Sequence, residues 1–434
     1  MDQQPLNLVY LTPGAGGMFC GSCLNDNMLA ANLHRMGHDV TLVPLYTPIT
    51  TDEPNASIDK LFFGGINVYL QQKVPLFRFV PRFLDRALDS PGLVGKLAGR
   101  AVGLEAKQLG QLTLSMVRGE HGHQRKEVRR LVDWLKTQSR PDVVNFSNLL
   151  IAGCAPSIKR ELGVPIVVTL QGDDVFLDDL PDPYRQQVIA EMQSLAACID
   201  RFVVHSDFYA EKMRQYFDIP GDRIDVVPLG ISLDGFSPAA VGPPPTIGYL
   251  ARICPAKGLH LLVDAFLKLK RDESLRAVEL HVAGWLGEAD RAYFEQQRAV
   301  IHDAGLADDF HYAGVLNREE KADFLRSLTV FSVPTTYHEP KGRYVLEALA
   351  CGVPVVQPGH GAFPELLGRT GGGRLYSPLE EGALPTALAE VLTDTELRNE
   401  LSQQGLVGVA TQASASQASE AMLAVYQRCR RPSA

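Results

Sequence analysis

The sequence contains no apolar run of the roughly 18–20 residues that a membrane-spanning helix needs. Its first residues also lack the basic segment and apolar core of a secretory signal peptide. Positive charge is in deficit, since the formal net charge is −8, and this argues against general nucleic-acid binding. The seven cysteines are an odd number scattered over a long chain, which favours a reducing compartment. We therefore expect a cytoplasmic protein without a membrane-spanning helix.

A complete dinucleotide-binding fingerprint is also missing. Gly14, Gly16 and Gly17 follow the first apolar strand and precede a helix, and glycine lets a backbone approach a ligand closely. Their spacing is not that of the fingerprint, and no acidic residue ends the second strand to bind a ribose. A nicotinamide enzyme is therefore disfavoured, and the loop is either a ligand-facing turn or simply a tight turn.

Short apolar strands alternate with helical patterns along the 434 residues, which predicts mostly parallel sheets covered on both faces. The series breaks at the proline-rich stretch Ser237–Thr246 and then restarts, so we predict two α/β domains joined by a linker. Their expected ranges are 1–236 and 247–410, followed by a C-terminal segment, 411–434, with a helix over about Ser416–Arg430. The expected strands are Leu6–Leu11, Asp39–Leu45, Asp142–Phe146, Pro165–Leu170, Arg201–Val204, Arg223–Pro228, Ile247–Leu250, Ala277–Ala283, Asp309–Ala313, Thr329–Val333 and Val353–Val356.

Residues 73–136 differ from the rest of the chain because they carry thirteen basic and six acidic side chains, a local excess of about seven positive charges. The segment begins with aromatic residues mixed with arginines. Such a stretch is suited to peripheral contact with an anionic membrane at its inner face, or to a large acceptor. Because only part of it has a clean amphipathic period, a helical hairpin inserted into the first domain is the favoured alternative.

Two glutamates separated by seven residues, Glu339 and Glu347, follow an apolar strand of the second domain. Glu339 is expected at the carboxyl end of that strand, where ligands bind in open α/β sheets. The helix that follows offers its N-terminus to phosphate. Upstream, Arg252 and Lys257 lie between a strand and a helix. Two cations at such a turn can neutralise a diphosphate without a metal.

These two segments resemble signature elements of retaining glycosyltransferases of the GT-B fold, family 4. Residues 247–258 are similar to the family's strand–Arg–loop–Lys-Gly element. Lys341 stands where the family usually has phenylalanine, and Ala362 replaces a loop glycine. The glutamate segment matches the family pattern at Glu339, Gly342, Glu347, Ala350, Gly352, Pro354, Val355, Val356, Gly361, Pro364 and Glu365. The resemblance covers most of the chain and implies two doubly wound, Rossmann-like domains with a cleft between them, the last helix crossing back to the first domain.

The resemblance also implies a hexosyltransferase-type enzyme without cofactor or metal, acting on a nucleotide-diphosphate sugar and a sugar, lipid or small-molecule acceptor. Arg252 and Lys257 would stabilise the leaving diphosphate. Glu339 would hold sugar hydroxyl groups near the anomeric carbon, and Glu347 would bind the ribose. Retention would proceed by same-face attack, with the leaving phosphate taking the acceptor's proton. Further donor contacts would come from Gly16, Gly17, Gly284, Lys341, Gly342 and Gly361.

The first domain carries the residues expected on the acceptor and sugar side. Gln171, at or near the position of a family histidine, can hydrogen-bond a sugar but cannot shuttle a proton at neutral pH. Asp173 is a candidate to bind a donor or acceptor hydroxyl. His205 is a reserve candidate for acid–base work, with a structural role at a strand end as the alternative. We interpret the neighbouring carboxylates as partners of a helix dipole rather than metal ligands; they are Asp173, Asp174, Asp178 and Asp179.

Cys20 and Cys23 form a C-x-x-C at the start of the first helix, where a helix N-terminus lowers a thiol pKa. Close packing of small residues is the favoured explanation, and a thiol-based redox protein is the alternative. Two further alternatives on this fold are a sugar-nucleotide epimerase or phosphorylase, and a non-catalytic nucleotide-sugar binding protein. The sequence does not name the sugar, the base or the acceptor.

Overall fold

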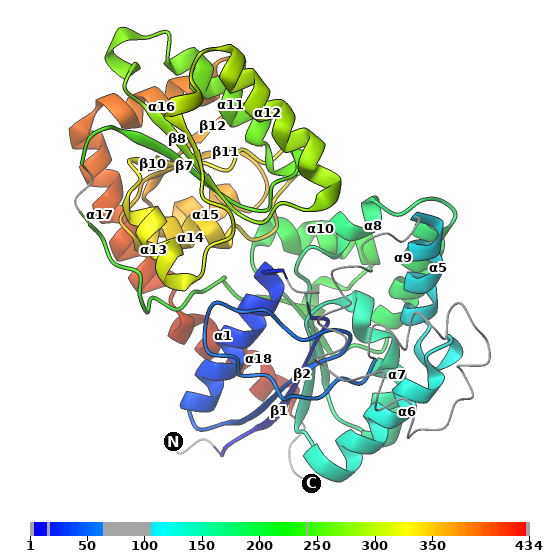
Figure 1. The fold of residues 1–434 in the computed structure, drawn as a ribbon. Helices are drawn as coiled ribbons and strands as arrows, with labels where there is room; N and C mark the ends of the chain where they lie inside the picture. Colours follow the sequence, from blue (N-terminus) through cyan, green and yellow to red (C-terminus); the bar gives the residue numbers. More distant parts are fainter. Residues whose placement is uncertain (1–3, 15–17, 64–105, 240–241, 431–434) are drawn as a thin grey trace. The chain divides into compact units, whose positions relative to one another are not determined.

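The computed structural model describes residues 4–14, 18–63, 106–239 and 242–430. The chain forms two compact units, the first of Met1–Pro228 with Ala418–Ala434 and the second of Leu229–Gln417 (Figure 1). The first unit ends at Pro228 rather than at residue 236, so the proline-rich stretch expected to be a linker lies within the second unit. Among the described residues, no helix combines the length and apolarity needed to cross a membrane.

The first unit is built on a parallel six-stranded sheet in the order β2-β1-β3-β4-β5-β6. Its central strands are apolar and almost wholly buried, as expected of a sheet covered by helices on both faces, whereas the edge strand β6 is only partly buried. The six strands are β1 (Asn7–Thr12), β2 (Asp39–Pro44), β3 (Val143–Phe146), β4 (Ile166–Thr169), β5 (Arg201–Val204) and β6 (Ile224–Val226). Its helices are α1 (Gly21–Arg35), α5 (Ala106–Val117), α6 (Arg125–Trp134), α7 (Ala155–Leu162), α8 (Asp173–Asp178), α9 (Tyr184–Ala196) and α10 (Asp207–Phe217).

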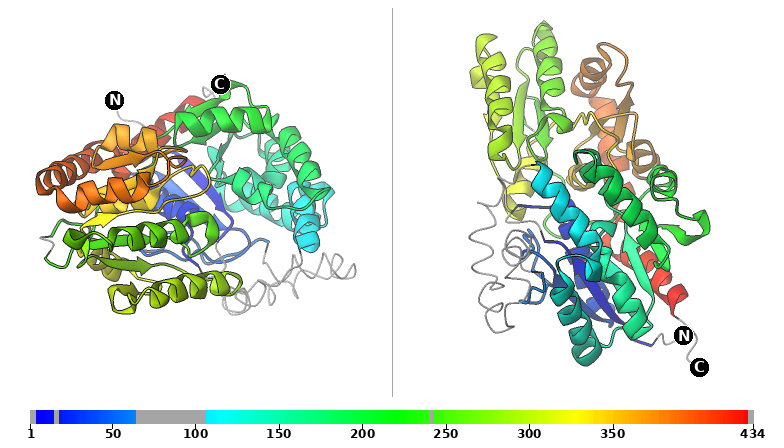
Figure 2. Two further views of the ribbon diagram at one scale, coloured as in Figure 1. Left: turned by 90° about the horizontal axis from the view of Figure 1, so that it is seen from above. Right: turned by 90° about the vertical axis from the view of Figure 1, so that its right-hand side faces the viewer.

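The C-terminal helix α18 (Ala415–Cys429) belongs to the first unit from Ala418 onward. It lies beside the sheet of that unit, as both views in Figure 2 show. The Tyr426 ring packs edge-on against Tyr10 of β1 with 6.2 Å between centroids, and Arg428 pairs with Asp225 of β6 at 2.7 Å. A segment at the end of the sequence therefore completes a unit whose other residues precede Leu229.

The described part of the basic segment, 106–136, forms α5 and α6, which pack against α9 and α7 of the first unit. Two of its cations pair with acidic residues of that unit: Arg118 with Glu191 at 2.7 Å, and Lys136 with Glu161 at 2.5 Å. This arrangement matches the inserted helical hairpin favoured as the alternative. Residues 64–105, where the mixture of aromatics and arginines occurs, lie outside the described residues.

The second unit has its own parallel six-stranded sheet in the order β12-β11-β10-β7-β8-β9. Its strands are β7 (Thr246–Leu250), β8 (Glu279–Ala283), β9 (Phe310–Tyr312), β10 (Val330–Phe331), β11 (Val355–Pro358) and β12 (Gly373–Tyr376). Its helices are α11 (Leu259–Leu269), α12 (Arg291–Asp303), α13 (Arg318–Arg326), α14 (Arg343–Ala350), α15 (Phe363–Thr370), α16 (Ala383–Thr393) and α17 (Thr395–Gln412). In Figure 1, α11, α12 and α16 lie on one side of the sheet and α13, α14 and α15 on the other.

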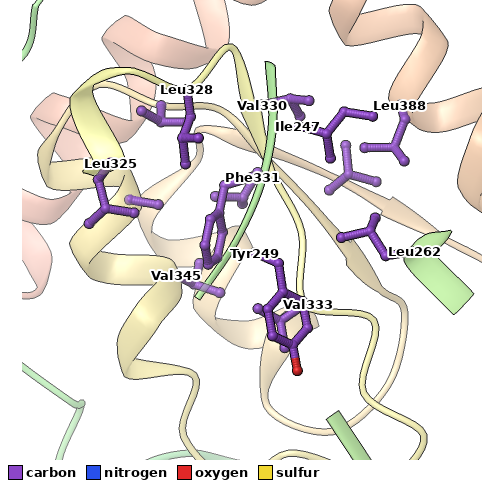
Figure 3. Packing of buried hydrophobic residues seen from close by; sticks show 14 of the residues in the cluster. Ile247, Tyr249, Leu262, Leu325, Leu328, Val330, Phe331, Val333, Val345 and Leu388 are labelled. Carbon is purple, nitrogen blue, oxygen red and sulfur yellow. The ribbon is translucent and has the colours of Figure 1, made fainter. Parts of the chain in front are cut away.

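The core of the second unit forms where the central strands β7 and β10 meet the helices (Figure 3). Tyr249 and Phe331 are fully buried, as is Val333 just beyond β10. Fully burying one such apolar side chain stabilises the fold by about 1.5–3 kcal/mol. Adjacent parallel strands held in this way bring the loops at their carboxyl ends together at one edge of the sheet.

Candidate active site

Three neighbouring strands supply the loops of the candidate site in the second unit. β7 and β10 pair, as do β10 and β11, so their carboxyl ends lie side by side. The loop after β7 carries Lys257, the loop after β10 carries Glu339, and the loop after β11 carries Gly361. Residues more than 80 positions apart in the sequence therefore meet because the strands that precede them are hydrogen-bonded neighbours.

Two glycines allow these loops to pack closely. Gly258 has φ +73°, and a Cβ there would lie 1.8 Å from the Pro334 carbonyl oxygen. Gly361 has φ +64°, and a Cβ there would lie 2.7 Å from the backbone nitrogen and oxygen of Glu339. A side chain at either position would strain the backbone and push the loops apart. The loops are tied further by hydrogen bonds from Thr336 N to Ala256 O, 3.0 Å, and from Ala362 N to Glu339 O, 2.8 Å.

Lys257 and Glu339 form a buried ion pair, with 2.5 Å between Lys257 Nζ and Glu339 Oε2. The hydroxyl groups of Tyr337 and Tyr344 donate to the same carboxylate oxygen at 2.7 and 3.2 Å. Lys257 Nζ also donates to Tyr337 Oη at 2.6 Å and lies 5.0 and 5.1 Å from the centroids of the two tyrosine rings. The ammonium group has three N–H donors, and among the described residues two are used, so one is left for a ligand.

The charge of Glu339 is fixed by this environment. Burial alone would raise the pKa of Glu339, but the Lys257 charge and the hydrogen bonds from Lys257 and Tyr337 outweigh burial and lower the pKa to about 2. The charge of Lys341 acts in the same direction. Glu339 is therefore an anion at neutral pH and accepts hydrogen bonds, so it can hold hydroxyl groups but cannot act as a general acid.

Arg252 lies on the loop after β7 and is exposed. Burial raises the pKa of Tyr337 well above its ordinary value, and the positive charge of Arg252 opposes that rise. Arg252 is therefore close enough to act electrostatically on the Lys257–Glu339 cluster. Among the described residues it makes no ion pair with either glutamate of the motif, and its side chain interacts instead with Cys254 of the same loop.

Glu347 of α14 lies in a separate ion cluster that joins α14 to α13. Its Oε1 accepts from Lys321 Nζ of α13 at 2.8 Å and from Arg343 Nε, one helical turn earlier, at 3.1 Å. The Glu347 side chain is 5% exposed and those of Lys321 and Arg343 are 9% and 7% exposed. Two buried cations thus contact one carboxylate oxygen of a buried anion, close to the N-terminus of α14.

Two further glycines expected at the donor site, Gly342 and Gly284, have definite places. Gly342 has φ +77° and is the residue immediately before α14, so it sets the start of that helix. Gly284 follows β8, where its N–H donates to Gly314 O at 2.7 Å and its carbonyl accepts from Tyr312 Oη at 2.9 Å. Gly16 and Gly17 lie outside the described residues. The first two are therefore loop anchors near the carboxyl edge of the sheet.

Two family models match consecutive parts of the chain. The model described as Glycosyltransferase Family 4 matches residues 105–234, and the model described as Glycosyl transferases group 1 matches residues 234–406. The chain is a GT-B glycosyltransferase. A D-inositol 3-phosphate glycosyltransferase from Actinosynnema mirum is 28% identical over 405 residues, 85% of this chain and 93% of the relative. A D-inositol 3-phosphate glycosyltransferase 2 from Catenulispora acidiphila is 26% identical over 385 residues, 80% and 84% of the two chains.

Solved structures show the same fold. A sucrose-phosphate synthase from Thermosynechococcus elongatus aligns with a TM-score of 0.71 at 16% identity, covering 97% of this chain and 98% of that one. Anabaena HepE in complex with UDP-glucose aligns with a TM-score of 0.67 at 15% identity, covering 97% and 99%. These likenesses confirm the two Rossmann-like domains expected from the sequence.

The first unit of this glycosyltransferase holds a buried polar cluster around Asp26 of α1. Asp26 Oδ2 accepts from Thr12 Oγ1 at 2.8 Å and from Ser147 Oγ at 2.5 Å, and Oδ1 accepts from Gln171 Nε2 at 3.2 Å. Gln171 Oε1 accepts from Asn25 Nδ2 at 3.3 Å. Both ends of the Gln171 amide are thus engaged within the protein, and a sugar hydroxyl would have to compete with these groups.

His205 directly follows β5, and its Nδ1 donates to Val227 O at 2.9 Å. The ring is buried and joins β5 to the residue that follows β6, which is a structural contact at a strand end.

Two carboxylates near α8 form ion pairs with different basic residues of the first unit. Asp174 pairs with Lys212 at 2.5 Å, and Asp178 with Arg185 at 2.9 Å. No group of three possible metal ligands forms there among the described residues.

Asp173 anchors a loop and yields a prediction about pH. Its carboxylate accepts from Leu149 N at 2.7 Å and from Gln171 N at 3.2 Å. Burial raises the pKa of Asp173 to about 6, and these backbone N–H groups oppose the rise. Since the pKa in an unfolded chain is about 3.9, the folded protein binds the extra proton between about pH 4 and 6. The stability that Asp173 contributes is therefore fully present below about pH 4 and falls by up to about 1.4 kcal/mol per pH unit as pH rises to about 6.

We expect this slope to disappear in Asp173→Asn, which cannot titrate. The measurement is urea unfolding of both proteins from pH 4 to 7. The difference in unfolding free energy, wild type minus variant, should fall as pH rises to about 6 and stay level above it. A difference that is constant over the whole range would mean that Asp173 ionises normally in the folded state.

The inner thiol of the C-x-x-C pair, Cys23, does not have the environment of a reactive thiol. Cys20 immediately precedes α1 and Cys23 is fully buried in its first turn. A hydrogen bond with Cys20, together with burial, raises the pKa of the Cys23 thiol far above its ordinary value. The expectation that the helix N-terminus lowers this thiol pKa was therefore wrong for Cys23. A protonated thiol is a poor nucleophile, so Cys23 itself is not poised to attack a disulfide.

A cavity of about 940 Å³ lies beside the candidate site in the second unit. The residues after β10 and β11 contribute to its wall, as do α11 and α16. Its lining residues include Thr335, His338 and His360 but neither Lys257 nor Glu339. The Lys257–Glu339 pair is therefore not part of the wall of this cavity.

Several residues of these clusters were not predicted as site residues from the sequence. They are Tyr337, Tyr344 and Lys321 in the second unit, and Thr12, Asn25, Asp26 and Ser147 in the first. Lys321 had a detectable signature, because it precedes Ala322 and Leu325 on the buried face of α13. Asp26 had one as well, because Asn25, Asp26 and Asn27 are consecutive polar residues in a helix that directly follows a glycine-rich loop.

Proposed function

We propose that this glycosyltransferase transfers a sugar from a nucleotide-diphosphate sugar to a hydroxyl group with retention of configuration and without a catalytic metal. The observation that carries the proposal is the Lys257–Glu339 pair at the carboxyl edge of the second sheet, with Arg252 exposed nearby. One edge thus offers cations for a diphosphate and a fixed anion for sugar hydroxyls. Solved structures of the same fold hold UDP and UDP-glucose, which supports a uridine nucleotide as the first donor to test.

The proposed chemistry follows from these charges. The bond between the anomeric carbon and the β-phosphate oxygen breaks, and the anomeric carbon bonds to the acceptor oxygen on the same face. The acceptor's proton passes to the leaving phosphate oxygen. Lys257 and Arg252 stabilise the negative charge that develops on the diphosphate, as preorganised donors do. Glu339 orients the sugar through its hydroxyl groups, since its low pKa prevents it from supplying a proton.

Glu347 is proposed to bind the ribose with only one of its two carboxylate oxygens. The family pattern assigns it the ribose hydroxyls, yet Lys321 and Arg343 already occupy its Oε1. Ribose binding would have to use the other carboxylate oxygen. The acceptor is proposed to bind the first unit. Because relatives carry the name D-inositol 3-phosphate glycosyltransferase, that compound is the first acceptor to test.

A thermal-shift screen with UDP, GDP and ADP and their glucose conjugates tests the donor. A ligand that binds only the folded state stabilises it and so raises Tm. At a free ligand concentration of a hundred times Kd, the added stability is about 2.7 kcal/mol. We expect a clear rise with at least one nucleotide, and a smaller rise in Lys257→Ala. No shift with any of them would overturn the assignment of the donor site.

Transfer itself is tested with the best donor, and the anomeric coupling of the product is read by NMR. We expect the donor's configuration to be kept and the rate to be unchanged by EDTA. An inverted product or a loss of rate in EDTA would contradict the proposed mechanism. Turnover without acceptor would favour the epimerase. Nucleotide-sugar binding that is unchanged in Glu339→Ala, with no transfer by wild type to any acceptor, would favour the binding protein.

A further inference from the structure

Two adjacent strands of the second unit place two histidines and a glutamate together. In β8, Glu279 and His281 are two residues apart, so their side chains project from the same face of the strand. In β9, His311 lies directly opposite His281 in the parallel register. The three side chains therefore share one face of the sheet, at its edge.

Their polar atoms converge. His281 Nε2 lies 2.9 Å from Glu279 Oε2, and His311 Nε2 lies 3.5 Å from the same oxygen. One ligand atom from each of the three side chains can be chosen so that all lie within 4.8 Å of one another, which occurs at no other group of this kind among the described residues. Zinc binds nitrogen and oxygen at about 2.0–2.1 Å, which puts the ligands of a tetrahedral ion roughly 3.3 Å apart.

We propose that Glu279, His281 and His311 bind a divalent transition-metal ion of the zinc class. Two imidazole nitrogens and one carboxylate suit Zn²⁺, Co²⁺ or Ni²⁺, whereas Mg²⁺ and Ca²⁺ prefer an all-oxygen set. Three protein ligands leave a fourth position for water. The ligand side chains are 25%, 25% and 51% exposed, so an ion can enter from solvent.

The opposite face of these strands is closed by α12. Phe294 of α12 packs against Tyr312 and Phe310 of β9, with 4.6 and 6.3 Å between ring centroids. His311 lies between these two residues in sequence, so it projects away from α12. The proposed ion is thus held on the side of β8 and β9 that this helix does not cover.

The proposed ion has a structural role. Two of its ligands come from β8 and one from β9, which is the last strand in the order of the sheet. Binding would clamp this short edge strand to its neighbour. Glu279 is the first residue of β8, whereas Lys257 and Glu339 follow the carboxyl ends of their strands. The inference is therefore independent of the proposed function, and the ion takes no part in sugar transfer.

The test is a metal titration of the full-length chain, carrying no affinity tag and stripped with a chelator. Co²⁺ is added first because its visible absorption reports coordination, and Zn²⁺ is then titrated in competition. We expect one ion per chain in wild type and at least tenfold weaker binding in His311→Asn and in Glu279→Gln. Zn²⁺ should raise Tm in wild type but not in His311→Asn.

His302→Asn is the matched control, since His302 is a 78% exposed histidine of the same unit that lies beside Asp303. It should bind Zn²⁺ as wild type does. Two imidazole N–H groups donating to Glu279 without a metal would give the same interatomic distances, and in that case no stoichiometric binding would be found at micromolar Zn²⁺. That result would overturn the proposal, as would equal affinity in His311→Asn or a loss of the ion in Cys20→Ser instead.

Discussion

Replacing Lys257 with alanine is expected to lower kcat/KM for the nucleotide sugar by about 10²–10³-fold, the cost of removing one preorganised donor to the charge of a transition state. Lys257 holds Glu339 at 2.5 Å and has an N–H left for a phosphate. Its loss removes a cation from the proposed diphosphate site. The measurement is steady-state kinetics with the donor and acceptor identified by the binding and transfer assays.

Lys268→Ala is the control, because Lys268 lies in the last turn of α11, away from the loop that carries Lys257, and its ion pair with Asp264 is exposed. It should keep wild-type kinetics. The effect of Lys257→Ala should appear with every donor that has the same diphosphate, whatever its sugar. A fall of less than about threefold would show that Lys257 does not contact the reacting diphosphate.

Replacing Glu347 with alanine is expected to destabilise the second unit by about 3–5 kcal/mol, the usual cost of breaking a buried ion pair by removing one partner. The change removes the Glu347 carboxylate, with which both Lys321 and Arg343 pair, from a buried position. Urea or thermal unfolding of the variant measures the loss.

Glu390→Ala serves as the control, since Glu390 is an exposed residue of α16, and we expect a change within about 0.5 kcal/mol. Combining Glu347→Gln with Lys321→Met should recover part of the loss, because the uncompensated charge is reduced. If Glu347→Ala is as stable as wild type but binds the donor more weakly, the stabilising role is wrong. Glu347 would then act only in binding the ligand, as the sequence suggested.

Most of the two sheets could be predicted because a buried parallel strand is a short apolar run between helical patterns. The predicted Arg201–Val204 coincides with β5, and Ile247–Leu250 differs from β7 by one residue. β12 was missed because it lies at the edge of its sheet and carries Arg374 and Leu375, both exposed. Its pairing with β11 depends on the fold rather than on an apolar run.

The candidate site was only partly predictable for a similar reason. Lys257 and Glu339 follow strands, and neighbouring parallel strands bring such residues to one edge. Their partners depend on side-chain geometry and helix packing, which a sequence pattern does not specify. Tyr337 donates to Glu339 from the same loop, and Lys321 of α13 donates to Glu347 of α14.

The most direct test of this account is calorimetric titration of the full chain with the nucleoside diphosphate that gives the largest thermal shift. The account predicts one site per chain in wild type, the same affinity in Lys268→Ala, and at least tenfold weaker binding in Lys257→Ala. Equal affinity in wild type and Lys257→Ala would contradict it, because the diphosphate would then bind away from the Lys257–Glu339 pair.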